Sequence, residues 1–182
     1  MLTSLYVLIN TGYYEIKYTM QKKCRAEIQE TIEKGPITFM NLVDNVECVS
    51  ETVDVFVKEL KNQGEVAERK SKFRVLYCPK IQLEKIEFFE LMLTPTIKSI
   101  ILLMMKTSEI SQLELEEILA KSRPSISRSL KILVENGLIE KLYHAPKMTY
   151  RIQNKQKLVS WMKVTHPKIV DRMSDGLTEM FM

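Results

Sequence analysis

One helix and the strand after it are encoded in SRPSISRSLKILVENGLIEK, residues Ser122 to Lys141. Ser122 suits the N-cap of a helix, and Pro124 suits its first turn. Apolar residues then recur at helical spacing, at Ile126, Leu130 and Leu133. Gly137 offers a left-handed stop after the last turn. These signals predict a helix from about Pro124 to Glu135.

The residues before this helix predict two more helices. Thr94 and Pro95 form an N-cap and first-turn pair. An apolar stripe follows them, at Ile97, Ile100, Ile101, Met104 and Met105. Ile110 can form a short strand, and Ser111 with Glu114 matches a capping box that opens a second helix ending near Lys121. The residues of that helix expected to face inward are Leu115, Ile118 and Leu119.

Two strand-like runs follow the third helix, at residues 138–143 and 148–152, and they flank a polar hairpin tip from His144 to Lys147. The order of elements is helix, short strand, helix, helix, hairpin. This is the order of a winged helix-turn-helix domain.

The same pattern occurs twice in the chain. Shifted by 73 residues onto itself, the sequence aligns without a gap. The matched pairs are Ile28 with Ile101, Ile37 with Ile110, Leu42 with Leu115, Val53 with Ile126, Leu60 with Leu133, Gly64 with Gly137, Val66 with Ile139 and Tyr77 with Tyr150. Solenoid repeats are roughly 20 to 50 residues long, whereas this period suits an independently folding unit. The sequence therefore predicts a mainly α fold with small β-hairpins (α+β), made of two tandem winged helix-turn-helix domains.

The stretch from Leu113 to Ile152 combines a Ser/Arg-rich third helix, an L-x-x-x-G-L-I-E-K ending and a hairpin wing. It resembles the DNA-binding domains of MarR-like and ArsR-like transcriptional regulators. Both copies fit, and together they extend from about Met20 to Lys155. The resemblance implies that the third helix enters the major groove of DNA. Winged-helix domains that bind protein or RNA share the same apolar spacing and glycine, so the resemblance specifies the fold more firmly than the ligand.

The outward side of the third helix in the second copy is polar and basic, with no acidic residue before Glu135. Hydroxyls and backbone N–H groups at a helix N-terminus bind phosphate, and arginine makes bidentate contacts with guanine. The alternative is that these side chains only cap and solvate an exposed helix. The candidate DNA-binding residues on the helix are Ser122, Arg123, Ser125, Ser127, Arg128, Ser129 and Lys131.

The two hairpin wings supply further candidates. Those of the second wing are Lys141, His144, Lys147 and Arg151, and those of the first wing are Arg69, Lys70, Lys72 and Arg74. The third helix of the first copy differs, because Asp54 and Val55 stand where the second copy has Ser127 and Arg128. Carboxylates at Glu51, Asp54 and Glu59 would lie beside phosphates. We therefore expect the second copy to dominate DNA affinity.

Charge and composition agree with this division. Residues 20–92 carry 12 Lys and Arg against 13 Asp and Glu, whereas residues 93–160 carry 11 against 6. A basic excess of this kind attracts a phosphate backbone.

No apolar run approaches the length of about 18 residues that a membrane span needs, and no signal peptide is expected. Cys24, Cys48 and Cys78 are odd in number and widely spaced, which predicts reduced thiols in a cytoplasm and neither a disulfide nor a zinc site.

The chain divides into five predicted segments. They are an N-terminal β-hairpin or arm (1–19), a first winged-helix domain (20–80), a linker helix (81–93), a second winged-helix domain (94–155) and a C-terminal helical segment (156–182). The N-terminal segment reads as a hairpin, with a short helix as the alternative. The C-terminal segment can dock on its own domain or on a partner subunit. We expect a homodimer that uses the N-terminal segment, the C-terminal segment or both, because operators are often palindromic.

The resulting hypothesis is a sequence-specific regulator of transcription that binds double-stranded DNA as a homodimer, in the cytoplasm of a prokaryotic, archaeal cell. It needs no cofactor or metal, and no phosphate-binding glycine loop, nucleophile elbow or paired metal ligands suggest an enzyme. The alternative is a tandem winged-helix subunit that holds proteins together, for example within the transcription machinery.

Overall fold

The computed structural model describes residues 19–144 and 147–166. The chain divides into two compact units, Met1–Gln82 and Leu83–Met182. The expected N-terminal hairpin lies outside the described residues, as do the hairpin-tip residues 145–146 and the apolar pattern after His166.

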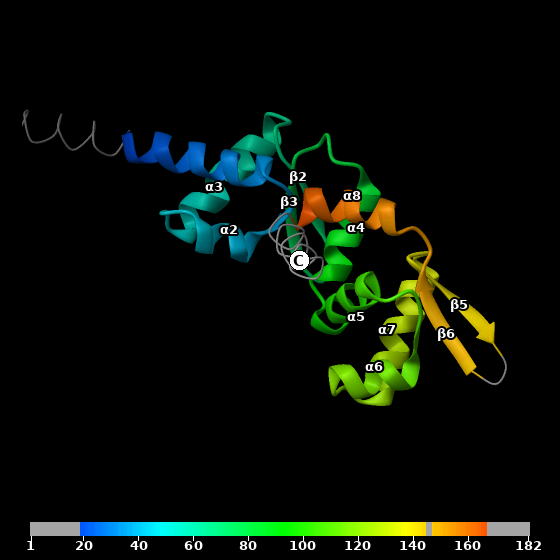
Figure 1. Ribbon diagram of the computed structural model, residues 1–182. Helices are drawn as coiled ribbons and strands as arrows, with labels where there is room; N and C mark the ends of the chain where they lie inside the picture. Colours follow the sequence, from blue (N-terminus) through cyan, green and yellow to red (C-terminus); the bar gives the residue numbers. More distant parts are fainter. Residues whose placement is uncertain (1–18, 145–146, 167–182) are drawn as a thin grey trace, which may run out of the picture. The chain divides into compact units, whose positions relative to one another are not determined.

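Residues 19–82 of the first unit form three helices and a three-stranded antiparallel sheet (Figure 1). Residues 19–33 are helical. The elements after them are β1 (Ile37–Thr38), α2 (Phe39–Asn45), α3 (Ser50–Asn62), β2 (Ala67–Lys70) and β3 (Arg74–Tyr77). The strand order is β1-β3-β2. Short strand β1 pairs with β3, and β2 and β3 form the wing.

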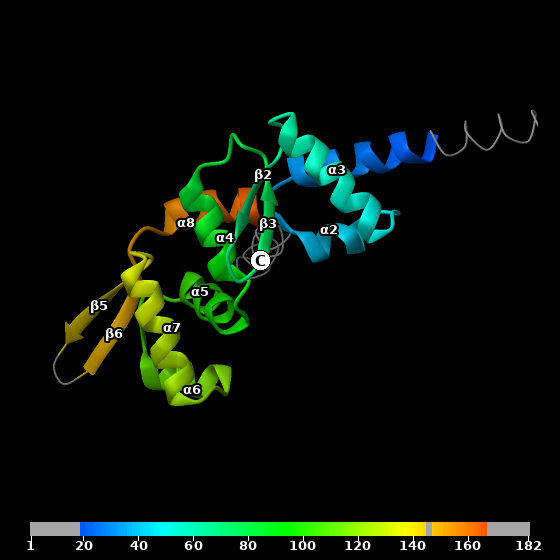
Figure 2. The ribbon, with the colours of Figure 1, turned by 180° about the vertical axis from the view of Figure 1, so that it is seen from behind.

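The second unit repeats this order and adds a helix at each side of it (Figure 2). Its elements are α4 (Leu83–Met92), α5 (Pro95–Lys106), β4 (Ile110–Ser111), α6 (Gln112–Leu119), α7 (Arg123–Glu135), β5 (Ile139–His144), β6 (Lys147–Ile152) and α8 (Lys155–Thr165). The strand order β4-β6-β5 matches that of the first unit. The predicted pair of winged-helix domains is therefore confirmed.

Local signals in the sequence account for the ends of the helices. Ser111 and Glu114 form the predicted capping box, in which each side chain bonds the backbone of the other residue. Gly137 has φ +65°, a conformation that favours glycine, and it stops α7 as expected. Ser122 stands at the N-cap of α7, but its side chain makes no capping hydrogen bond.

Each unit has its own apolar core. In the second, the helix predicted to join the copies is α4, and its side chains Phe88 and Met92 are buried in the core of that unit. The ring of Phe88 lies 5.5 Å from that of Trp161 on α8. The prediction that Ile118 faces inward is wrong, because its side chain is 59% exposed and only Leu115 of α6 is fully buried.

No single helix among residues 19–144 and 147–166 is long and apolar enough to cross a membrane. The helices α4 and α5 reach that length and composition only as a pair, which is bent by 104° at the break between them.

The pairing of the strands shows that the two copies do not align without a gap. Ile37 pairs with Leu76 in the first unit, and Ile110 pairs with Tyr150 in the second. Ile37 and Ile110 are 73 residues apart, but Leu76 and Tyr150 are 74 apart. The second wing is therefore one residue longer at its turn, and Tyr150 takes the place of Leu76, not of Tyr77. Consequently Arg74 corresponds to Met148.

The cysteine prediction is wrong for two of the three thiols. Cys24 and Cys48 form a disulfide with a Cα–Cα distance of 6.1 Å, and Cys78 is free. The fold brings the two residues together because the helix at residues 19–33 packs against the turn that precedes α3. Their separation of 24 residues in the sequence gave no sign of this contact.

His166 follows α8 and lies beside buried groups of the second unit. Its ring centroid is 5.3 Å from that of Phe89. Burial and the nearby charge of Lys98 lower the pKa of His166 from 6.5 to about 4. The folded protein therefore holds this imidazole neutral at pH values where the unfolded chain would protonate it.

We expect the free energy of unfolding to decrease as the pH falls from 6.5 towards 4, by up to about 3 kcal/mol, because only the unfolded state gains the proton of His166 in this range. His166→Phe should remove this part of the pH dependence. Urea denaturation of both proteins at several pH values measures the difference. An imidazole that titrates near pH 6.5 by NMR in the folded protein would contradict the prediction.

Candidate nucleic-acid interface

The outward face of α7 in the second unit is exposed and basic. Ile126, Leu130 and Leu133 are buried and orient the helix as predicted. The exposed residues on its other faces include Arg123, Ser127, Arg128 and Lys131. Within the described part of the chain, the guanidinium groups of Arg123 and Arg128 have no ion pair or hydrogen bond. Both groups are therefore open to an incoming ligand.

The beginning of α7 is suited to an anion. Its first turn contains no acidic residue, and Ser122 and Arg123 are exposed there. The first backbone N–H groups of a helix have no partner within the helix, and the helix dipole favours negative charge at this end. Ser125, also in the first turn, is half-buried.

Ser129 does not lie on the outward face. Its side chain is buried, and its hydroxyl donates to the backbone oxygen of Ser125 at 2.9 Å. The expectation that Ser129 faces a ligand is wrong, because this residue lies next to Leu130 on the side of the helix that packs against the core. A serine hydroxyl can be buried here because a backbone carbonyl of the preceding turn accepts a hydrogen bond from it.

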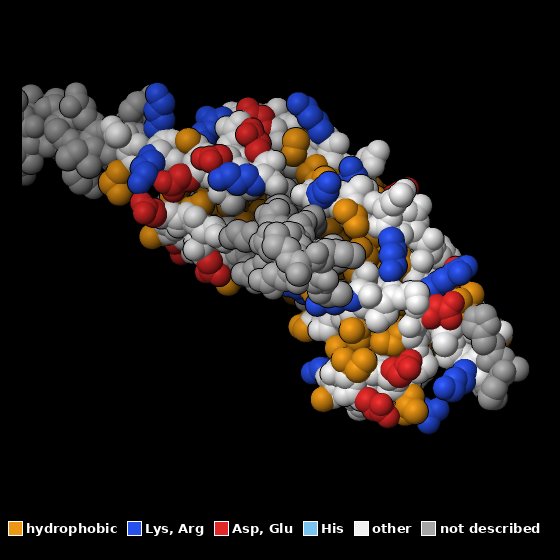
Figure 3. Space-filling view, in the orientation of Figure 1, with side chains coloured by type: hydrophobic (Ala, Val, Ile, Leu, Met, Phe, Trp, Pro, Cys, Tyr) orange, Lys and Arg blue, Asp and Glu red, His pale blue; other side chains and the backbone are white. Residues whose placement is uncertain are grey.

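The second wing places basic groups beside this helix. Figures 1 and 2 show the β5–β6 hairpin running alongside α7, and on the face drawn in Figure 3 Lys and Arg side chains flank the hairpin. Lys141 and Lys147 are exposed. Arg151 instead pairs with Glu140 on the neighbouring strand, which raises the pKa of the Arg151 guanidinium. The backbone of His144 ends β5, and its side chain is outside the description.

Tyr143 is a candidate that the sequence analysis missed. It is 78% exposed, the highest value among the large hydrophobic side chains described. The ammonium group of Lys141 lies 5.4 Å from the centroid of its ring. A flat aromatic ring beside cations can pack against a sugar or a base edge. The signal in the sequence was an aromatic residue immediately before the polar tip of a hairpin.

The corresponding helix of the first unit, α3, has a different surface. Val53, Val57 and Leu60 are buried, as the corresponding residues are in α7. Its exposed residues include Glu51, Glu59 and Val55, whose side chain is 52% exposed. A phosphate backbone would meet carboxylates and an apolar side chain on this face.

The first wing is joined to α3 by a network of charges. Arg74 on β3 donates to Asp54 on α3 and to Glu68 on β2, each at 2.7 Å. Lys61 on α3 also pairs with Glu68, whose side chain is only 3% exposed. The Arg74 guanidinium lies 4.1 Å from the centroid of the Phe39 ring. Arg74 is therefore held by three groups of its own unit, the carboxylates of Asp54 and Glu68 and the ring of Phe39.

The carboxylates of this network stay ionised. Burial alone would raise the pKa of Glu68, but hydrogen bonds from Lys61 and Arg74 outweigh it and lower the pKa below 4.5. Hydrogen bonds from Lys58 and Arg74 lower the pKa of Asp54 below its ordinary value. The prediction that Arg74 is available to DNA is contradicted by this arrangement.

The other three candidates of the first wing are less constrained. Lys70 is exposed and lies 3.7 Å from Glu68, and Lys72 is exposed, with its ammonium group 5.4 Å from the centroid of the Phe73 ring. Arg69 is half-buried. Each cation near Glu68 has part of its charge offset by that carboxylate.

Among the described residues of the second unit, the positions of this network hold other side chains. Ser127 occupies the position of Asp54, Lys141 that of Glu68, and Met148 that of Arg74. Two carboxylates are thus replaced by a hydroxyl and a cation. The second unit thus has an exposed cation, Lys141, where the first unit has the carboxylate that binds Lys61 and Arg74.

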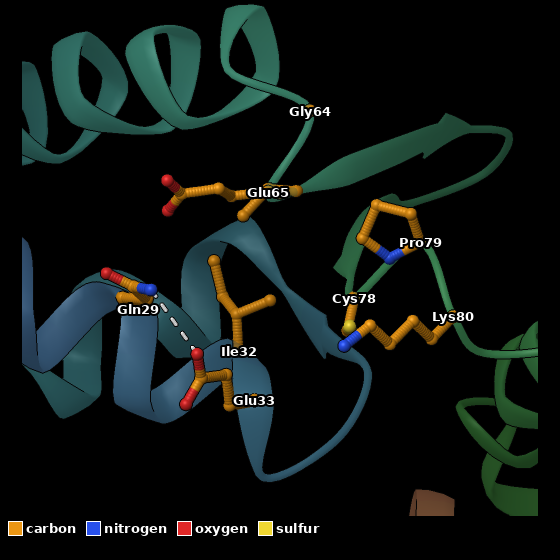
Figure 4. Close-up of a pocket in the computed structure, with 9 residues that line it drawn as sticks. Gln29, Ile32, Glu33, Gly64, Glu65, Cys78, Pro79 and Lys80 are labelled. Atoms are coloured by element: carbon orange, nitrogen blue, oxygen red, sulfur yellow. Dashed lines mark hydrogen bonds between the residues drawn. The ribbon is translucent and has the colours of Figure 1, made fainter.

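A cleft of about 290 Å³ also opens in the first unit (Figure 4). Gln29, Glu33 and Glu65 line it, with the free thiol of Cys78 and the side chain of Lys80 on the opposite wall. Gln29 donates to Glu33 at 3.3 Å. We assign the cleft no part in nucleic-acid binding, because its two carboxylates would repel phosphate.

Comparison with known proteins identifies part of the second unit. Residues 95–141, which extend from α5 into β5, match the family described as "Bacterial regulatory protein, arsR family". This unit therefore contains an ArsR-type helix-turn-helix domain. No curated protein sequence matches the chain.

Solved structures with a similar arrangement include a chain of the endosomal complex ESCRT-II, at 15% identity and a TM-score of 0.30, covering 84% of this chain and 68% of that one. The mRNA-binding domain of elongation factor SelB from E. coli, solved with SECIS RNA, is 11% identical with a TM-score of 0.29. That match covers 74% of this chain and 98% of the domain. Both TM-scores are below 0.5, so the family match alone bears on function.

We expect Arg74→Met, which copies the second unit, to destabilise the first unit by about 2 kcal/mol at neutral pH, because Glu68 keeps its buried charge but loses a partner. Lys58→Ala removes only an exposed pair with Asp54 and should cost less than about 0.5 kcal/mol. Since the carboxylate pKa values are lowered, the difference between wild type and Arg74→Met should shrink as the pH falls below 4.5. Denaturation curves at pH 7 and pH 3 test this, and equal costs for both variants would refute it.

Proposed function

We propose that this chain is a sequence-specific regulator of transcription that binds double-stranded DNA through α7 and the β5–β6 wing. The observation that carries the proposal is the contrast between equivalent faces of the two copies. The second copy exposes Arg123, Arg128 and Lys131, whereas the first exposes Glu51 and Glu59. The ArsR-type domain at residues 95–141 supports DNA binding in general terms.

In this proposal, α7 lies in the major groove with its N-terminus towards the backbone. Arg128 reads a guanine by a bidentate contact, and Ser122 and Ser127 bind phosphate oxygens together with the first backbone N–H groups of the helix. Lys141 and Lys147 hold the wing against the backbone by charge, which positions the helix without reading sequence. Such contacts require neither a cofactor nor a catalytic group.

The setting of this activity is also proposed. The regulator acts in the cytoplasm of an archaeal cell as a homodimer, so that two copies of α7 meet the half-sites of a palindromic operator. The N-terminal segment before residue 19 and the C-terminal segment after residue 166 are the proposed dimer elements. Partners in the transcription machinery would then be reached from the bound operator.

One observation favours a second function, a protein-interaction subunit. The exposed Val55 lies between Glu51 and Glu59 on α3, a face suited to a basic, partly apolar protein surface. The two functions differ in their response to salt. Phosphate contacts release counterions, so DNA affinity falls steeply with ionic strength, whereas an apolar protein interface responds weakly.

The proposed DNA contacts are tested by three alanine variants, after bound oligonucleotides have been selected from a random pool. Arg128→Ala should weaken binding by about 1 to 3 kcal/mol and relax the preference at one base pair. Lys147→Ala should weaken all sequences alike and reduce the salt slope by about one ion. Lys58→Ala, on the first copy, should have much less effect, because Lys58 pairs with Asp54 at 2.7 Å.

Binding titrations at two salt concentrations measure these effects. If Lys58→Ala and Arg128→Ala were equally harmful, both third helices would enter grooves and the asymmetry would be wrong. If none of the three variants changed affinity, the protein-interaction function would replace DNA binding.

We expect sedimentation to show a homodimer at concentrations of tens of micromolar, and its dissociation should depend on protein concentration. Removal of residues 1–18, or of residues 167–182, should shift the equilibrium towards the monomer if that segment forms the interface. A monomer both with and without DNA would rule out the proposed assembly.

A further inference from the structure

Three side-chain links join the turn between α2 and α3, residues 46–49, to the helix at residues 19–33. Cys48 forms the disulfide with Cys24. The ammonium group of Lys23 lies 2.8 Å from Glu47 Oε2. The backbone N–H of Glu47 donates to Glu27 Oε2 at 3.3 Å. The turn of the first helix-turn-helix is thus tied at consecutive residues to one helix face.

The disulfide is the strongest of these links. The side chains of Lys23 and Glu47 are 63% and 81% exposed, so water and salt screen their ion pair. The hydrogen bond to Glu27 is long and exposed. The covalent disulfide is neither screened by salt nor weakened by competition with water. Its loss would leave residues 46–49 without a covalent link to the helix, with Val46 still buried in the core of the unit and Glu47 held only by the two exposed contacts.

The equivalent turn of the second unit is built differently. Ala120 adopts a left-handed conformation with φ 48°, and its N–H bonds the carbonyls of Glu116 and Glu117. In the first unit, α2 ends at Val46 in an extended conformation, and the N-cap of α3, Val49, makes no side-chain hydrogen bond. Val49 and Ser122 both lack a side-chain capping hydrogen bond, so the two turns differ at the C-cap of the preceding helix, and the unit without the left-handed C-cap has the disulfide.

The two cysteines have no equivalents in the second unit. At the repeat of 73 residues, Cys24 corresponds to Ile97 and Cys48 to Lys121. Ile97 is buried and Lys121 is exposed. A disulfide at this turn is therefore not a requirement of the fold, and it can open without removing a feature that both copies share.

The sulfur atoms also differ in access. Cys24 is only 6% exposed, whereas Cys48 is half-buried within the turn. The thiolate of a dithiol can approach Cys48 Sγ, form a mixed disulfide and break the bond to Cys24, which leaves as a thiolate and takes up a proton. The second thiol of the reductant then releases Cys48. Two electrons and two protons pass to the protein, and the dithiol becomes a disulfide.

We propose that Cys24 and Cys48 form a reversible thiol–disulfide site that sets the order of the turn before α3 in the first unit. Its reductants are dithiols and its oxidants are small-molecule disulfides. When the bond opens, residues 46–49 and the first turn of α3 loosen, while the caps of α6 keep the equivalent turn of the second unit unchanged. This inference does not depend on the proposed DNA binding.

Hydrogen exchange of the full chain, measured by mass spectrometry before and after treatment with dithiothreitol, tests the site. We expect amides at residues 46–53 to exchange roughly tenfold faster after reduction, because local opening loses its strongest restraint. Amides at residues 119–126, the equivalent turn of the second unit, should not change. Addition of glutathione disulfide should restore the slow exchange.

Two controls accompany this experiment. Alkylation should label only Cys78 in the oxidised protein and all three cysteines in the reduced protein. Cys78→Ser should leave the change in exchange intact, whereas Cys48→Ser should exchange fast at residues 46–53 with or without dithiothreitol.

Three results would overturn the proposal. One is labelling of all three thiols after treatment with glutathione disulfide, since the bond would then not form. Another is equal exchange at residues 46–53 in both states. The third is faster exchange throughout residues 19–77 after reduction, because the disulfide would then hold the whole unit together and not its turn.

Discussion

The buried apolar stripe of the third helix is the constraint on which the surface of each copy depends. Val53, Val57 and Leu60 in α3, and Ile126, Leu130 and Leu133 in α7, are all buried. Burial of these side chains provides a large favourable free energy, and it fixes the rotation of each helix about its axis. This rotation then determines whether each other residue of the helix faces the core or the solvent. The two helices have the same rotation, so their outward residues can be compared position by position.

The two copies stabilise the turn between their second and third helices by different chemistry. In the second unit, the left-handed Ala120 and the capping box of Ser111 with Glu114 stabilise α6 at both ends from within. In the first unit, Thr38 caps the start of α2, but its end is held from outside by Cys24 and its neighbours. A turn stabilised by its own backbone depends on little else. A turn stabilised by a distant helix depends on whatever controls that contact.

The sequence predicted the fold well because its signals were local. The capping box at Ser111 and the left-handed Gly137 act within a few residues, and the apolar spacing determines which faces are buried. The contacts it missed join distant segments. The disulfide spans 24 residues, and the bond from Arg74 to Asp54 spans 20. The one-residue difference between the wings was hidden because Tyr77 and Tyr150 match by coincidence at the offset of 73 residues.

The candidate site was predicted less completely, for a related reason. A helical wheel sorts residues by angle, and it placed Arg128 and Lys131 outward, where they are exposed. It could not sort Ser129, which lies at the border of the buried stripe and whose small hydroxyl can bond to the preceding turn. Arg74 looked like a free wing cation because the carboxylates that hold it come from other elements. Tyr143 was overlooked because a lone aromatic in a strand usually packs inward.

Asp54 illustrates why the first copy is poorly suited to DNA for two coupled reasons. Its carboxylate would repel a phosphate at the surface of α3, and it also binds Arg74, the wing cation nearest to that helix. Glu68 likewise forms ion pairs with Lys61 and Lys70. At these positions the second copy has Ser127 and Lys141. Replacing two carboxylates therefore does more than change the net charge, because it also removes the acidic partners that bind Lys and Arg side chains in the first copy. A basic surface on this fold depends on the absence of internal acidic partners as much as on the presence of Lys and Arg.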